Sequence, residues 1–227
     1  MEIKGSVALV TGANRGIGRA LTRALLGCGA AKVYAGARDP ASVADADVTP
    51  LRLDVTKPGE IAAAAAAAGD VTIVINNAGA GGTGTTLLDG PLDSAREAME
   101  VNYFGTWAVS RAFAPILARN GGGAMVNVLS LASWVGRPGV PGYAASKAAE
   151  WSLTNSLRDG LRDQGTLVVA VHAGFVDTDF SAWVDAPKIS AASVAEQVTR
   201  ALATDTPEVL ADEGTRQVKA ALSRAVQ

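Results

Sequence analysis

The chain has 227 residues, 48% of them hydrophobic and 19% charged, with a formal net charge of −2 at pH 7. This length and balance predict one α/β domain, and the charge gives no reason to expect nucleic acid or an anionic membrane as a partner. Cys28 is the only cysteine and His172 the only histidine. An intrachain disulfide is therefore excluded, and a His-rich zinc site or a Ser-His-Asp triad has little room.

Neither a signal sequence nor a membrane span is indicated. No apolar run reaches the ~20 residues that a membrane-spanning helix needs, and residues 1–10 lead directly into a candidate strand. We therefore expect a cytoplasmic protein without bound metal. Cys28 falls in an apolar helical stretch and is expected to be a buried, unreactive thiol.

Short apolar runs alternate with helical segments along the chain. The runs are continuously apolar, which is typical of parallel strands covered on both faces. The candidate strands are Val7–Val10, Lys32–Ala35, Leu51–Leu53, Thr72–Ile75, Ala124–Leu129 and Leu167–His172. The candidate helices are Gly16–Leu26, Gly59–Ala68, Asp93–Ala118, Tyr143–Asp163 and Ala192–Ala203. This order predicts a single Rossmann-type domain over residues 1–227, with a doubly wound parallel sheet and helices on both faces.

The end of the chain has helical periodicity. Residues Thr215–Val226 place Val218, Ala221, Leu222 and Ala225 on one helical face. That face is expected to pack on its own subunit or on a neighbouring one.

A glycine-rich segment, Thr11-Gly12-Ala13-Asn14-Arg15-Gly16-Ile17-Gly18, follows the first candidate strand. Glycines here let backbone amides approach a pyrophosphate, and the N-terminus of the next helix adds partial positive charge. The spacing Gly-x-x-x-Gly-x-Gly differs by one residue from the usual dinucleotide fingerprint. The segment is therefore either a dinucleotide-binding loop or a tight turn, and its place between a Val-rich strand and an amphipathic helix favours the first.

This loop, with Asn76-Asn77-Ala78-Gly79 and Tyr143-Ala144-Ala145-Ser146-Lys147, resembles the short-chain dehydrogenase/reductase family. The motifs stand in the family's order and spacing up to about Thr178. The resemblance implies that Asn102, Ser130, Tyr143 and Lys147 are catalytic, with Asn102 helping to hold a proton-relay water. It implies a cofactor site formed by Gly12, Asn14, Arg15, Gly16, Ile17, Gly18, Arg38, Asp54, Val55, Asn76, Ala78, Gly79, Tyr143, Lys147, Gly174, Val176 and Thr178. One departure is Ala173-Gly174, where the family usually has Pro-Gly, and we expect a looser turn there without loss of activity.

The spacing of Tyr143 and Lys147 suits acid–base chemistry. Four residues apart on a helix, both side chains project from one face. A free phenol has a pKa of about 10, and a nearby ammonium together with an oxidised nicotinamide favours the phenolate. Ser130 is expected to donate a hydrogen bond to the substrate oxygen as hydride arrives. Taken singly, Tyr143 is equally well a half-buried aromatic residue and Ser130 a hydroxyl bonded to its own loop.

Two functions remain open at this point. The first is the reversible NADPH-dependent reduction of a ketone or aldehyde, with Tyr143 as general acid and a small molecule as substrate. The alternative is a non-enzymatic NADP(H)-binding module that senses redox state. The complete set of Asn102, Ser130, Tyr143 and Lys147 favours the enzyme, because a sensor has no need of a phenol–ammonium pair.

The choice between NADP and NAD depends on the end of the second strand. An NAD-binding unit places an acid about 20 residues past the loop, whereas here Ala37 stands at that position and Arg38 follows. Arg38 and Arg15 are predicted to bind the 2′-phosphate of NADP(H). In the alternative interpretation, Asp39 binds the ribose and Arg38 is a surface charge.

Substrate pocket and assembly are less constrained. Phe180, Trp183, Val184 and Ile189, together with Trp134, either wall an apolar substrate pocket or cover the cofactor and core. His172 has either a structural role, which is favoured, or a place in the wall of the site. In the family the helices matching Asp93–Ala118 and Tyr143–Asp163 pair across a two-fold axis, so a homodimer or homotetramer is expected. Its apolar contacts would come from Ala108, Ala112, Trp151 and Leu157.

Overall fold

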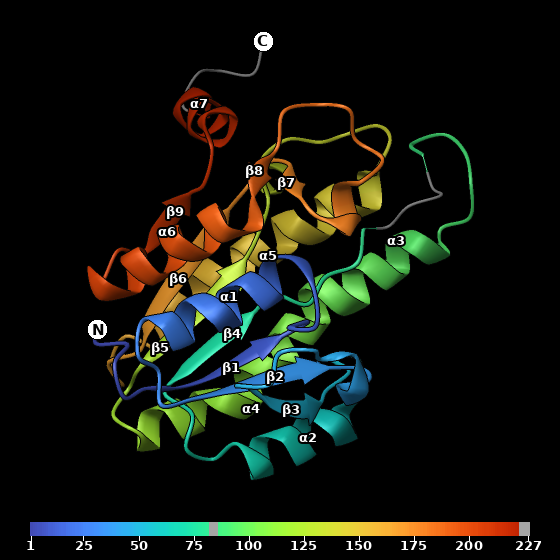
Figure 1. The fold of residues 1–227 in the computed structure, drawn as a ribbon. Helices are drawn as coiled ribbons and strands as arrows, with labels where there is room; N and C mark the ends of the chain where they lie inside the picture. Colours follow the sequence, from blue (N-terminus) through green and yellow to red (C-terminus); the bar gives the residue numbers. More distant parts are fainter. Residues whose placement is uncertain (82–85, 223–227) are drawn as a thin grey trace.

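The computed structural model describes residues 1–81 and 86–222 (Figure 1). A parallel sheet of seven strands runs through its centre, in the order β3-β2-β1-β4-β5-β6-β9. The strands are β1 (Val7–Thr11), β2 (Lys32–Ala37), β3 (Thr49–Arg52), β4 (Ile73–Asn76), β5 (Ala124–Val128), β6 (Leu167–His172) and β9 (Glu208–Leu210). The short strands β7 (Val176–Asp177) and β8 (Ile189–Ser190) pair separately. The predicted doubly wound parallel sheet is confirmed.

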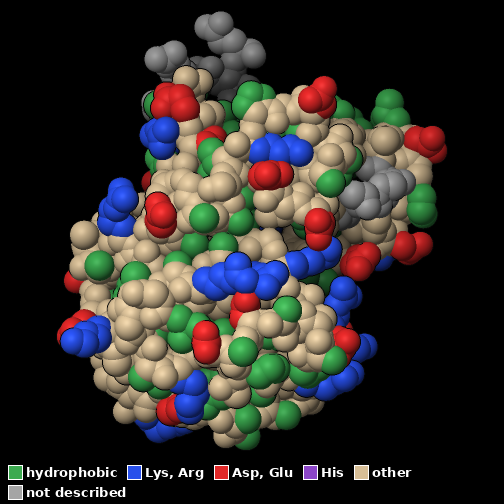
Figure 2. All heavy atoms as spheres, viewed as in Figure 1, with side chains coloured by type: hydrophobic (Ala, Val, Ile, Leu, Met, Phe, Trp, Pro, Cys, Tyr) green, Lys and Arg blue, Asp and Glu red, His purple; other side chains and the backbone are tan. Residues whose placement is uncertain are grey.

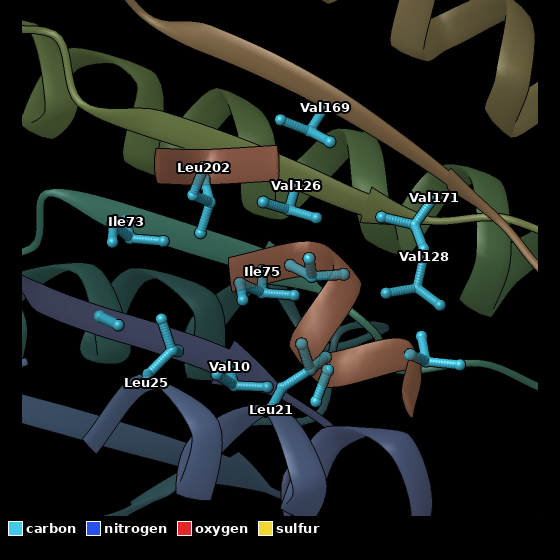
Figure 3. Packing of buried hydrophobic residues seen from close by; sticks show 14 of the residues in the cluster. Val10, Leu21, Leu25, Ile73, Ile75, Val126, Val128, Val169, Val171 and Leu202 are labelled. Carbon is cyan, nitrogen blue, oxygen red and sulfur yellow. The ribbon is translucent and has the colours of Figure 1, made fainter. Parts of the chain in front are cut away.

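Helices cover both faces of the sheet. Helices α1 (Gly16–Gly27) and α6 (Ala191–Ala203) lie side by side on one face, and α2 (Pro58–Ala67), α4 (Thr106–Arg119) and α5 (Pro141–Gly160) lie on the other (Figure 1). Successive strand residues point to opposite faces, so Val10 packs toward α1 and Leu9 toward α4. Figure 3 shows the first of these two cores, with Leu21 and Leu202 packed over the valines and isoleucines of the strands. Burial on both faces explains the continuously apolar strand sequences.

The strand order reverses between β1 and β4. The chain leaves β1 for β2 and β3 on one side, then crosses to β4, β5 and β6 on the other. The loops after β1 and β4 therefore diverge at the carboxyl edge of the sheet, and a crevice for ligands forms at such a switch point. The family-like motifs all fall on loops and helix starts at this edge.

The segment predicted as one helix over Asp93–Ala118 is divided into three. Helix α3 (Asp93–Ala98) is followed by a π-helix, η2 (Met99–Gly105), and then by α4. A π-helix adds a residue to the turn and is often found at functional sites. Here it contains Asn102, and it brings Gly105 so close to Val55 that a Cβ on Gly105 would lie 2.7 Å from Val55 Cγ2.

Three further expectations are corrected or extended. The prediction of a buried Cys28 is wrong, because α1 ends at Gly27 and leaves the thiol exposed at the helix end. Strand β9 was not predicted. Helix α7 (Glu213–Ala221) does form, and of its predicted apolar face Val218 is partly buried, whereas Ala221 and Leu222 are exposed. Ala225 of that face lies outside the described residues.

The surface carries charges of both signs. Lys and Arg side chains alternate with Asp and Glu over the face shown in Figure 2. Within residues 1–81 and 86–222, no helix combines the length and apolarity needed to cross a bilayer. Over the same ranges, His, Cys, Asp and Glu side chains form no group of three or more suited to a metal ion.

Candidate active site

The glycine-rich loop joins β1 to α1 in a conformation that depends on its glycines. Gly12 and Gly16 have φ angles of +63° and +54°, a region that disfavours other residues. A Cβ on Gly18 would lie 2.2 Å from the carbonyl oxygen of Gly12. The N-cap residue of α1, Arg15, makes no side-chain capping bond, so its side chain leaves the first amides of this helix, with their partial positive charge, uncapped.

Thr11 and Asn77 hold the glycine loop against the loop that follows β4. The Thr11 hydroxyl accepts the amides of Asn77 and Ala78 at 2.9 and 3.0 Å. The Asn77 side chain donates to the carbonyls of Thr11 and Gly12 at 2.9 and 3.1 Å. The two loops that border the crevice are thereby fixed to each other, and sequence reasoning assigned no role to Thr11.

Three of the predicted cofactor-binding residues differ in burial and in their hydrogen-bond partners: Asn76, Asp54 and Val55. The Asn76 side chain turns into the core and donates to Asn127 Oδ1 at 2.8 Å and to Ser110 Oγ at 3.3 Å. Val55 is buried in the second core. Burial acts to raise the pKa of Asp54, but hydrogen bonds from Thr56 and nearby cations, Arg38 among them, lower it below its usual range. The cofactor role of these three residues stays a prediction.

The two arginines predicted to bind a 2′-phosphate are both exposed, and they lie on separate loops. Arg15 approaches Asp179 at 3.5 Å across the crevice, and Arg38 follows the end of β2. Asp39, the alternative ribose ligand, caps the short 3-10 helix η1 (Pro40–Ser42) by accepting the amide of Ala41 at 3.0 Å. Its carboxylate is therefore engaged locally.

The loop after β2 is also tied to α1. Asp45 accepts hydrogen bonds from Arg19 at 2.9 Å and from Arg23 at 2.6 Å, and these bonds lower the pKa of Asp45 to about 2. Arg38 thus extends from a segment that is anchored at both ends.

Ser130 lies at the carboxyl end of β5, at the start of the 3-10 helix η3 (Leu131–Ser133). Its hydroxyl oxygen accepts the amide of Ala132 at 3.1 Å. A serine hydroxyl has one proton to donate, and this backbone bond fixes the oxygen while leaving that proton for another acceptor.

Tyr143 and Lys147 occupy the first two turns of α5. Tyr143 is half-buried, and its ring centre lies 5.9 Å from that of Phe180. Lys147 is buried, and its Nζ donates to the carbonyl of Val128 at 2.8 Å and to Glu150 Oε2 at 2.7 Å. Burial would lower the pKa of Lys147, but the Glu150 carboxylate and, more weakly, Tyr143 raise it. The ammonium is thus bound to the carbonyl of Val128, two residues before Ser130, and belongs to a residue one helical turn after Tyr143.

Asn102 links the loop after β4 to α5. Its side chain bonds both backbone groups of Ala80, accepting from N at 2.8 Å and donating to O at 2.9 Å. It also donates to Ser146 Oγ at 2.8 Å, and Ser146 in turn donates to the carbonyl of Tyr143. The structure therefore brings Asn102 to the helix of Tyr143, while its role in holding water stays a prediction.

The segment after β6 closes over the glycine loop. A Cβ on Gly16 would lie 3.2 Å from Thr178 Cγ2, so Thr178 sits against the start of α1. The turn at Ala173-Gly174 is held by Asp212, whose carboxylate accepts the Gly174 amide at 2.6 Å. Asp212 also caps α7, which ties the C-terminal helix to this turn. Val176 is buried in the first core.

His172 and Trp134 form the wall behind Ser130. The two rings are stacked with centres 3.9 Å apart, and His172 Nδ1 lies 3.2 Å from the carbonyl oxygen of Ser130. Lys219 of α7 lies over the Trp134 ring at 4.9 Å and binds Glu208 at 2.8 Å. Burial lowers the pKa of His172 to about 4, which keeps it neutral at pH 7. These contacts favour a structural role for His172.

The apolar residues of Asp179–Ser190 divide into two groups. Phe180 and Trp183 are 46% and 68% exposed, whereas Ile189 packs against the first core. A separate cavity of about 460 Å³ lies between residues 132–138 and α5, lined by Trp134 and Ala144 among others. It does not include Ser130 or Tyr143 in its lining.

Sequence reasoning missed the residues that support the site from behind. Neither the family motifs nor the hydrophobic periodicity of the sequence identifies these residues, which are Glu150, Asp212, Glu208 and Lys219. The three-residue spacing of Lys147 and Glu150 on one helix indicates that the two side chains can pair, but it does not indicate that the pair is buried.

The chain is similar to known proteins over most of its length. The model of the short chain dehydrogenase family matches residues 6–188. The chain is 35% identical to a 1-deoxy-11-beta-hydroxypentalenate dehydrogenase from Streptomyces avermitilis, over 90% of this chain and 84% of that protein. A Burkholderia cenocepacia short chain dehydrogenase in complex with NADP superposes with a TM-score of 0.94 at 40% identity, covering 99% of this chain and 95% of that one. A Burkholderia phymatum relative in complex with NAD gives 0.87 at 27%, covering 96% and 93%.

The buried neutral His172 is expected to make stability fall in acid. Its pKa of about 4 in the folded protein lies below the ~6.5 of an unfolded chain, so the unfolded state takes up a proton first as the pH drops. Between pH 7 and 4.5 this one group is predicted to remove roughly 2–3 kcal/mol from the free energy of unfolding. Urea unfolding of wild type and His172→Gln at both pH values measures this loss of unfolding free energy. An equal loss in the two proteins would refute the assignment of the loss to His172.

Proposed function

Because the chain belongs to the short-chain dehydrogenase/reductase family of oxidoreductases, we propose that it reduces a ketone or aldehyde to an alcohol with NADPH. The reaction is reversible, and Tyr143 is its general acid and base. The observation that carries the proposal is the buried Lys147 ammonium, which hydrogen-bonds the end of β5 at 2.8 Å. It holds α5, and with it Tyr143, beside the strand end that presents Ser130.

The crevice suits a nicotinamide dinucleotide. The absence of a Cβ at Gly12, Gly16 and Gly18 leaves a backbone cradle between the two loops. The uncapped start of α1 provides amide donors for a pyrophosphate. Asp54, Ala78 and Gly79 line the adenosine end of the proposed site, and Gly174, Val176 and Thr178 the nicotinamide end. When bound, the reduced nicotinamide supplies the hydride.

Each side chain has a distinct role toward the substrate. The Tyr143 phenol donates its proton to the carbonyl oxygen, and the Ser130 hydroxyl hydrogen-bonds the same oxygen while negative charge grows on it. The Lys147 ammonium favours the phenolate that remains. Asn102 fixes the loop after β4 to the helix of Tyr143. Phe180 lies against Tyr143 and, with Trp183, favours an apolar aromatic or aliphatic carbonyl.

NADPH is the proposed reductant because Arg15 and Arg38 carry exposed guanidinium groups on the loops that follow β1 and β2. Arg15 starts α1 and Arg38 follows β2, while the Asp39 carboxylate caps η1. The Burkholderia cenocepacia relative, similar over nearly the whole chain, binds NADP. The redox-sensor alternative gains no support from the buried ion pair beside Tyr143.

Replacing Tyr143 by Phe removes only the phenolic hydroxyl. We expect turnover to fall by at least ~10²–10⁴-fold, the usual effect of losing an acid–base group, with NADPH affinity retained. Initial rates of carbonyl reduction and NADPH fluorescence titration measure the two quantities. Tyr103→Phe is the matched control, since it removes a hydroxyl from the nearby π-helix and is expected to leave turnover unchanged. Normal reduction by folded Tyr143→Phe protein would rule out this mechanism.

The cofactor preference is expected to reverse in the double variant Ala37→Asp, Arg38→Gln. The new carboxylate accepts a ribose hydroxyl of NADH and repels the 2′-phosphate of NADPH. Two charge-assisted hydrogen bonds contribute roughly 1.5–3 kcal/mol each, which together correspond to about two orders of magnitude or more, an upper figure that solvation and salt screening reduce. The quantity to compare is the ratio of kcat/KM for NADPH and NADH, with Arg119→Gln at the distant end of α4 as the control. A wild-type preference for NADH would make Asp39 the ribose ligand.

We also propose a homodimer or homotetramer. Phe104 and Trp107, at the junction of η2 and α4, are 46% and 40% exposed and form an aromatic group with Tyr103. Burial of these rings and the adjacent α5 face in a neighbouring copy explains their exposure. Light scattering at micromolar concentration is expected to give a multiple of 23.0 kDa, and Trp107→Lys is expected to shift the mass toward the monomer. A monomeric wild type contradicts the proposal.

A further inference from the structure

A buried carboxylate lies next to the proposed catalytic lysine and takes no part in the scheme above. Glu150 is 1% exposed and stands one turn after Lys147 on α5. Its Oε2 lies 2.7 Å from Lys147 Nζ, the length of a charge-assisted hydrogen bond. Its Oε1 accepts the hydroxyl of Thr106 at 3.1 Å. Both carboxylate oxygens are therefore satisfied by named partners.

Neutral groups surround this ion pair. Thr154 Oγ1 donates to the Glu150 carbonyl and accepts from Asn127 of β5. From α4, Ser110 extends the network toward Asn76 of β4. None of these side chains carries a charge, so the network can hold the carboxylate in place but cannot neutralise the ammonium.

The charged and titratable groups that act on Lys147 are few. On α5 itself they are Glu150 and Tyr143. From β6, His172 interacts with Lys147 electrostatically, and its low pKa leaves it neutral at and above pH 7. The elements η2, α4, β4 and β5 contribute the neutral groups described above. Glu150 is thus the counter-ion of the Lys147 ammonium.

We propose that Glu150 is a positioning residue whose ionised carboxylate holds the Lys147 ammonium between β5 and α5 and keeps it charged at alkaline pH. This inference rests on the proposed function, because it concerns the lysine that supports Tyr143. Burial raises the pKa of Glu150 above its usual range, and the ammonium and the Thr106 hydroxyl offset only part of this rise, so the carboxylate is ionised at the alkaline pH that concerns Lys147. A charge pair at 2.7 Å with both carboxylate oxygens bonded is the arrangement in which an ion pair persists in a protein interior.

The first test is the pH profile of Glu150→Gln, which keeps the shape of the side chain and removes its charge. Without a counter-ion, burial favours the neutral amine of Lys147, and a neutral amine no longer supports Tyr143. The protonation state that is active in carbonyl reduction is therefore lost at a lower pH. The alkaline limb of kcat/KM is expected to move down by about 1–3 pH units.

The second test needs no cofactor and no activity. In Glu150→Gln the pKa of Lys147 in the folded protein lies below the ~10.4 of an unfolded chain, so the variant gains stability as the pH rises toward that value. Lys147 in the wild type has a raised pKa and gives no such gain. Urea unfolding midpoints at pH 7 and pH 10 are therefore expected to diverge between wild type and variant.

Two control variants separate charge from structure. Thr154→Val breaks two hydrogen bonds of the same network without changing charge, and is expected to lower the unfolding midpoint while leaving its pH dependence and the alkaline limb in place. Glu150→Asp retains the charge and is expected to restore most of the wild-type limb. A destabilised Glu150→Gln with unshifted profile and parallel unfolding curves would reduce Glu150 to a structural residue and overturn the proposal.

A measurement on the wild type covers the case in which Glu150→Gln does not fold. Nitrogen NMR of labelled lysine is expected to show Lys147 Nζ as an ammonium at pH 9, and a neutral amine there overturns the inference. Full reduction activity in Tyr143→Phe would instead overturn the proposed function, leaving the unfolding and NMR results to judge Glu150 separately.

Discussion

The proposed active site depends on one buried charge, the ammonium of Lys147. An ammonium with 4% exposure is stable only when its hydrogen bonds and its charge are satisfied nearby. The Val128 carbonyl satisfies it from β5 and Glu150 from α5. Because these partners belong to different elements, the same charge that favours a phenolate also fixes the helix of Tyr143 to the strand that ends at Ser130.

The remaining constraints converge on the same edge of the sheet. Thr11 and Asn77 join the loops after β1 and β4, Asn102 joins the β4 loop to α5, and Asp212 joins the turn after β6 to α7. Each bond links two loops or a loop and a helix, so side-chain hydrogen bonds fix the loops at this edge of the sheet to one another. Rigid placement of this kind is what hydride and proton transfer to a single carbonyl require.

Most of the fold and the family motifs could be predicted from the sequence, but few of the residues that hold those motifs in place could. Continuously apolar runs such as Leu167–His172 predicted parallel strands because burial on two faces leaves that mark. Strand β9 has three residues and exists through its pairing with β6, so local periodicity did not reveal it. The π-helix around Asn102 accompanies a close approach of Gly105 to Val55, a contact between distant segments that local periodicity does not reveal. Glu150 escaped notice because an acid on a helix is ordinarily exposed, and only tertiary packing places it inside.

We propose that this chain carries out chemistry with its dinucleotide and does not merely bind it. The most direct measurement incubates the purified protein with NADPH and a panel of apolar ketones and aldehydes, and follows both NADPH consumption and alcohol formation by mass spectrometry. We expect at least one carbonyl compound to be converted to its alcohol, with one NADPH consumed per molecule of product. Tight NADPH binding with no alcohol formed from any carbonyl, and no oxidation of the matching alcohols with NADP⁺, would contradict it and favour a redox-sensing module.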